Sequence, residues 1–101
     1  MQERREQMSQ VVTEALLLGV TESYPKRLEG IVERIRRYRR PISYNEALRA
    51  VDFLESRDMI LMRIPSRGGS RTLFIAKTAE VPDDPLGLIH KLMALHGIPR
   101  K

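Results

Sequence analysis

The 101-residue sequence contains no cysteine. This absence excludes disulfide bonds, thiolate metal sites and a cysteine nucleophile, and it fits a reducing compartment. No apolar run approaches the roughly 20 residues that cross a bilayer. The first ten residues are charged and polar, unlike a signal peptide. We therefore expect a cytoplasmic protein with no membrane partner.

Catalytic and cofactor motifs are missing as well. The glycines near residue 68 lack the spacing and the Lys-Ser/Thr ending of a phosphate-binding P-loop. The only two histidines, His90 and His96, are six positions apart and would not share a helix face, so we predict no metal site. No nucleophile constellation is recognisable. The sequence thus predicts no enzymatic activity and no cofactor, and no small-molecule ligand is evident.

Basic residues, by contrast, are abundant. Lys and Arg total 18 against 13 Asp and Glu, for a net charge of +5, and most of the basic residues are Arg. The planar guanidinium group matches phosphate geometry better than an ammonium group does. This composition favours a polyanionic partner, and the alternative is a solvated basic surface.

The length fits one domain, and the apolar periodicity predicts three helices in its first part. They are expected at residues 3–18, 24–38 and 43–57. We expect Gly19 to close the first helix, Ser23 to cap the second with Pro25 in its first turn, and Pro41 to stop it. Ser43 and Glu46 have the spacing of a capping box at the start of the third helix.

A change of period follows. Apolar segments 59–64 and 71–77 flank a Gly-Gly turn, which predicts a β-hairpin. Its apolar face would carry Ile60, Met62 and Ile64 together with Leu73 and Ile75. Asp84 as N-cap and Pro85 as first residue then predict a last helix at residues 86–96, beginning with apolar Leu86 and closed by Gly97.

The order of these elements and several local features resemble winged helix-turn-helix domains of bacterial, archaeal and phage regulators. Leu54-Glu55 is followed by a turn at Asp58 and by the apolar pair Met59-Ile60. A basic, Gly-rich tip and an apolar strand ending at Thr78 come next. Asp58 stands where the family often has Gly, and Asp tolerates the left-handed conformation better than most residues.

This resemblance implies an α+β, mostly helical fold: a winged helix-turn-helix with a β-hairpin wing and flanking N- and C-terminal helices. The single domain would span residues 1–101. Its parts would be an N-terminal helix in 1–22, the helix-turn-helix in 23–57, the wing in 58–78 and a C-terminal helix in 84–97.

The resemblance also implies a double-stranded DNA partner. The arginines around the turn at Pro41 would contact phosphates; alternatively, they form a solvated helix end that complements the helix dipole. Asn45 and Arg49 would read bases, since Asn pairs with adenine and Arg with guanine. The predicted DNA-binding residues are Arg36, Arg37, Arg39, Arg40, Tyr44, Asn45, Arg49, Arg63, Arg67 and Arg71.

Two functions follow as hypotheses. The first is a transcriptional regulator or a phage or plasmid DNA-binding factor, acting as a homodimer through the N- and C-terminal helices. The second is a protein–protein interaction module within a larger assembly. Asp52 and Glu55 on the third helix favour the second, because they would repel phosphates.

Overall fold

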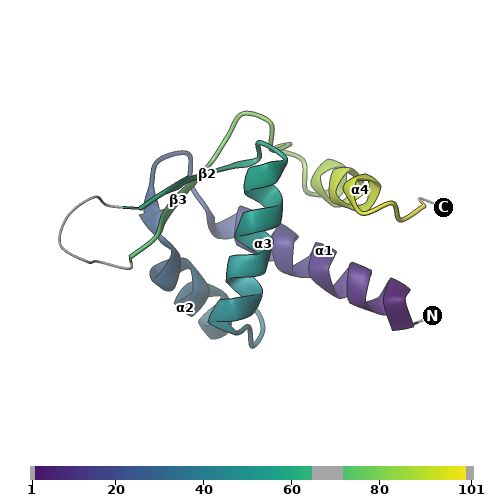
Figure 1. Ribbon diagram of the computed structural model, residues 1–101, viewed down its shortest axis with the longest axis horizontal. Helices are drawn as coiled ribbons and strands as arrows, with labels where there is room; N and C mark the ends of the chain where they lie inside the picture. The colour runs from purple at the N-terminus through teal and green to yellow at the C-terminus, as the bar shows by residue number, and fades with distance from the viewer. Residues whose placement is uncertain (1, 65–71, 100–101) are drawn as a thin grey trace.

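The computed structural model describes residues 2–64 and 72–99, which fold into four helices and a small sheet. The elements are α1 (Gln2–Val20), β1 (Lys26–Arg27), α2 (Leu28–Tyr38), α3 (Tyr44–Ser56), β2 (Ile60–Arg63), β3 (Phe74–Lys77) and α4 (Pro85–Leu95). The strands pair antiparallel in the order β1-β3-β2. Figure 1 shows α1 and α4 at the end of the molecule that holds both termini, the β2–β3 hairpin at the other end, and α3 between them.

Two helices begin where their capping residues predict. Ser43 Oγ accepts a hydrogen bond from the Glu46 amide at 3.0 Å, and Asp84 Oδ2 accepts one from the Gly87 amide at 2.8 Å. Each bond satisfies an amide that has no partner inside its own helix. Both predicted starts are confirmed.

The predicted start of α2 is wrong. Lys26 and Arg27 form a short strand opposite Ile75 and Phe74 of β3, and the helix begins only at Leu28. The Leu28 amide also donates to the Leu73 carbonyl at 2.8 Å. Pairing with a distant strand therefore replaces the predicted first turn and its Ser23 cap.

Glycine residues predicted the end of one helix correctly and the end of another incorrectly. Gly19 does not close α1, which continues to Val20 and adds a bond from the Thr21 amide to the Leu17 carbonyl. Gly97 does close α4, in the left-handed conformation at φ 71°. Asp58 has φ 62°, as the resemblance implied for the turn before β2.

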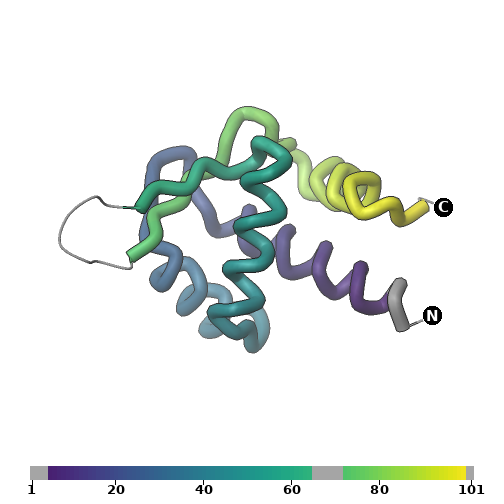
Figure 2. Tube along the Cα trace, viewed as in Figure 1, coloured from purple at the N-terminus to yellow at the C-terminus, as the bar shows by residue number. Residues whose placement is uncertain are grey.

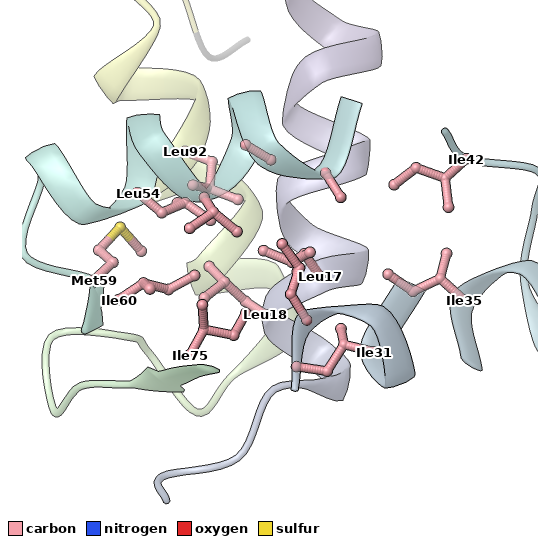
Figure 3. Packing of buried hydrophobic residues seen from close by; sticks show 14 of the residues in the cluster. Leu17, Leu18, Ile31, Ile35, Ile42, Leu54, Met59, Ile60, Ile75 and Leu92 are labelled. Atoms are coloured by element: carbon pink, nitrogen blue, oxygen red, sulfur yellow. The ribbon is translucent and has the colours of Figure 1, made fainter. Parts of the chain in front are cut away.

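The hydrophobic core lies between the four helices and one face of the sheet (Figure 3). Ile60 and Ile75 are buried there and Met62 is partly buried, as predicted. Ile64, however, is 65% exposed. The apolar face of this strand therefore ends at Met62 and not, as predicted, at Ile64. Leu86 is also exposed, because α4 turns Leu88 and Leu92 inward instead.

A charged group is buried among these side chains. Glu14 of α1 is fully buried, and His96 Nε2 lies 2.8 and 3.0 Å from its two carboxylate oxygens. The His96 ring stacks on Phe53 of α3, with ring centroids 4.2 Å apart. Burial raises the pKa of Glu14, and its contacts with His96 and Gln10 oppose that rise. Through its contacts with Glu14 and Phe53, His96 thus joins the end of α4 to α1 and α3.

Candidate nucleic-acid interface

The outward side of α3 is polar. Ala47, Ala50, Val51 and Leu54 face the core. Asn45, Arg49, Asp52 and Ser56 are exposed on the opposite side, as the helical period requires. Of the predicted DNA-binding residues on this helix, Asn45 and Arg49 are therefore accessible, whereas Tyr44 is half-buried against the core.

Arg49 also borders a crevice between α3 and α1. The crevice has a volume of about 440 Å³ and is lined on the α1 side by Gln10 and Thr13, among others. Glu46 of α3 lies along the same crevice. Asn45 and Arg49 therefore differ in setting, since only Arg49 stands beside a second helix.

The N-terminus of α3 has an arginine fixed beside it. Arg36 of α2 donates from Nε to the Ile42 carbonyl at 2.7 Å, and Ile42 directly precedes the Ser43 cap. A helix N-terminus carries a partial positive charge and attracts anions. The exposed Arg36 side chain adds a full positive charge at that point.

The other three arginines around Pro41 lie elsewhere. Arg40 donates from Nη2 to Thr13 Oγ1 at 2.9 Å, which ties the α2–α3 turn to α1. Arg37 and Arg39 line a groove on another side of α2. Successive residues of a helix point about 100° apart, so neighbours in sequence do not form one patch. Only Arg36 of the four stands beside α3.

The sheet presents a row of side chains that crosses all three strands. Phe74 of β3 is opposite Arg27 of β1 and Arg63 of β2. Directly opposed residues share a face of the sheet, and the inner face belongs to Ile75 and Met62. Arg27 and Arg63 are both exposed, so two guanidinium groups flank an aromatic ring on the outer face.

Arg63 was predicted from the sequence as a DNA-binding residue, whereas Arg27 was not. The two-residue strand that carries Arg27 is too short to leave a recognisable period. Arg27 also lies 3.5 Å from the carboxylate of Glu29, an exposed contact that leaves most of its side chain in solvent. Arg67 and Arg71, predicted for the wing tip, fall outside the described residues.

Other kinds of site find no support in the part of the chain that the structure describes. Within residues 2–64 and 72–99, no three His, Asp or Glu side chains gather as a metal site would require. None of the helices there combines the length and apolarity that spanning a membrane demands.

Among solved structures, the chain is similar to a PadR-like transcription factor from Bacteroides fragilis. The two superpose with a TM-score of 0.69 over 94% of this chain and 89% of that one, at 14% sequence identity. No protein-family profile and no curated protein sequence matches the chain. The structural likeness confirms the predicted fold: a mostly helical winged helix-turn-helix with a hairpin wing and flanking helices.

Proposed function

We propose that the protein is a transcriptional regulator that binds double-stranded DNA through α3 and the outer face of its sheet. The observation that carries the proposal is the bond between Arg36 and the Ile42 carbonyl, which holds a guanidinium group at the N-terminus of α3. Phosphate binds well at such a position. The structural likeness to a PadR-like transcription factor supports the same function.

Each residue has a separate role in this proposal. Arg36 and Arg63 bind phosphates and set the position of α3, while Arg27 extends the phosphate contact across the sheet. Asn45 reads a base edge from the exposed side of α3, and Arg49 reads a second. Tyr44 supports the helix from its half-buried position.

Three predicted residues are left out. Arg40 is occupied by Thr13, and its half-buried position suits a structural role. Arg37 and Arg39 line the groove on another side of α2. A duplex lying along α3 would not reach that side.

We further propose a homodimer formed by α1 and α4. Half-exposed apolar residues line both helices, among them Val12 and Leu16 on α1 and Leu86 and Met93 on α4. Figure 2 shows α1 and α4 side by side at the end of the molecule opposite to the hairpin. A two-fold axis there would leave both copies of α3 free to bind DNA.

The test is the salt dependence of binding to a random duplex, measured by fluorescence anisotropy. Each lost phosphate contact lowers the slope of log affinity against log salt by about 0.9. The double variant Arg36→Ala/Arg63→Ala is expected to lose about two such units. Arg34→Ala is the matched control, because Arg34 lies on the groove side of α2. Equal slopes for the wild type and the double variant would refute the proposed contacts.

A protein partner is the second candidate function. Asp52 and Glu55 are exposed on α3, where they disfavour phosphates. If micromolar wild-type protein shows no binding to random duplex at low salt, α3 is better assigned to a protein surface.

A further inference from the structure

A basic groove lies on the side of α2 away from Arg36 and the start of α3. Its walls are the end of α1 with the two residues after it (residues 19–22), the outer side of α2 with the residue after it (residues 30–39), and Lys77 of β3. Its volume is about 1030 Å³, slightly above the roughly 300–1,000 Å³ typical of small-ligand sites. No sequence motif indicates this groove, because its walls come from three separate segments.

The charges along the groove are mixed but mainly positive. Arg34, Arg37, Arg39 and Lys77 line it, together with the carboxylates of Glu22 and Glu33. Guanidinium groups bind phosphate through paired, charge-assisted hydrogen bonds. The two carboxylates would repel a continuous polyanion such as a DNA strand. This balance fits a small ligand with one anionic end.

Glu22 has an unmet hydrogen-bonding capacity. Its Oε2 atom is buried and has no hydrogen-bond partner among the described residues. The same residue is fixed in place by its carbonyl, which accepts from the Lys77 amide at 2.8 Å. A buried polar atom without a partner is costly and calls for a donor. A hydroxyl or amino group of a ligand in the groove would supply one.

A glycine, Gly30, forms part of the groove wall. Gly30 lies in the first turn of α2, and glycine favours a helix less than any other residue except proline. A Cβ built on it would meet none of the described atoms within 4 Å, so packing inside the protein does not require glycine there. Its absent side chain leaves room for a ligand to approach the helix.

An aromatic ring completes the groove. Tyr38 lines it and is 67% exposed. We propose that the groove binds a nucleoside phosphate. Arg34 and Arg37 would hold the phosphate, Tyr38 would stack on the base, and Glu22 would accept from a ribose hydroxyl. Aromatic stacking and a paired carboxylate are the contacts that distinguish a nucleotide from inorganic phosphate. This proposal does not depend on DNA binding by α3.

Calorimetric titration with three probes tests the proposal: adenosine 5′-monophosphate, inorganic phosphate and adenosine. We expect saturable binding of the monophosphate. Binding of each of the other two should be weaker by about tenfold or more, because each lacks a charged or stacking contact. No saturable binding of the monophosphate overturns the proposal, and so does equal affinity for inorganic phosphate.

Variants then locate the site. Gly30→Leu adds a bulky side chain to the groove wall and favours the helix, so it should abolish binding without lowering the unfolding temperature. Arg34→Ala should weaken the monophosphate by about tenfold, the effect of losing one charged hydrogen bond. Glu22→Gln should weaken the monophosphate but not inorganic phosphate. Arg5→Ala, near the opposite end of α1 from the groove, is the control and should change neither.

Two results on variants would also overturn the assignment. Unchanged monophosphate binding by a folded Gly30→Leu protein would place the ligand elsewhere. A loss of duplex affinity and of salt slope in Arg34→Ala would assign the groove to DNA. The Arg34→Ala result is distinct from a failure of the proposed DNA interface, because that interface is tested by the Arg36→Ala/Arg63→Ala variant.

Discussion

At the scale of single residues, Glu14 shows how a charge is tolerated in a small core. Its carboxyl group is removed from water, and His96 Nε2 lies within hydrogen-bonding distance of both oxygens. Phe53 covers the imidazole ring from one side, and the Arg57 guanidinium lies over the Phe53 ring at 5.1 Å. The end of α4 is thereby fixed to α1 and α3 by contacts that depend on geometry more than apolar packing does.

The raised pKa of Glu14 makes this contact sensitive to pH. The folded protein holds the Glu14 proton more tightly than the unfolded chain, whose carboxyl titrates near the ordinary 4.5. The free energy of unfolding that Glu14 contributes is therefore complete below that pH and decreases as pH rises through the raised pKa. Glu14→Gln keeps a hydrogen-bonding amide but cannot ionise. Urea unfolding across this range should show the wild type losing stability relative to Glu14→Gln, and parallel curves would contradict the prediction.

At the scale of elements, the start of α3 contributes both to the stability of the helix and to the proposed phosphate site. The Ser43 hydroxyl satisfies the Glu46 amide, and Arg36 is anchored one residue earlier on Ile42. Loosening the first turn of α3 would therefore also displace the site proposed for phosphate.

Replacing the Ser43 cap measures this contribution. Ser43→Ala should lower the free energy of unfolding by about 1 kcal/mol, the usual cost of losing an N-cap. Ser43→Asp is the matched control, because Asp caps as well as Ser and should keep wild-type stability. The urea midpoints of the two variants, compared at constant m-value, give the change in free energy of unfolding for each. An unchanged midpoint in Ser43→Ala would show that the 3.0 Å bond contributes nothing to folding.

The elements predictable from sequence were those whose signals are local. Ser43 and Asp84 marked the starts of α3 and α4, and the turn at Asp58 marked the start of the hairpin. Such signals act within one turn of chain. They need no knowledge of the rest of the fold.

The features that could not be predicted depend on distant partners. Lys26 and Arg27 become a strand only because β3 lies beside them. His96 meets Glu14 across 82 positions of sequence. The spread of the Pro41 arginines over several sides of the molecule follows from how α2 packs, which adjacency in sequence does not reveal.

At the scale of the whole molecule, the proposed functions separate along its length. The molecule measures 48 × 27 × 23 Å. The hairpin lies at one end, and α1 and α4 meet at the other (Figure 1). Phosphate binding on α3 and the sheet, and association through α1 and α4, can therefore occur at the same time.

Association through α1 and α4 is tested by a matched pair of exposed leucines. Leu86 on α4 is 61% exposed and Leu61 on the outer sheet face is 60% exposed. Leu86→Glu should convert a dimer into a monomer in light scattering after size exclusion, because it places a charge in the proposed apolar contact. Leu61→Glu adds the same charge outside that contact and should leave the mass of the dimer unchanged. A monomeric wild type, or the same mass for both variants, would refute the interface.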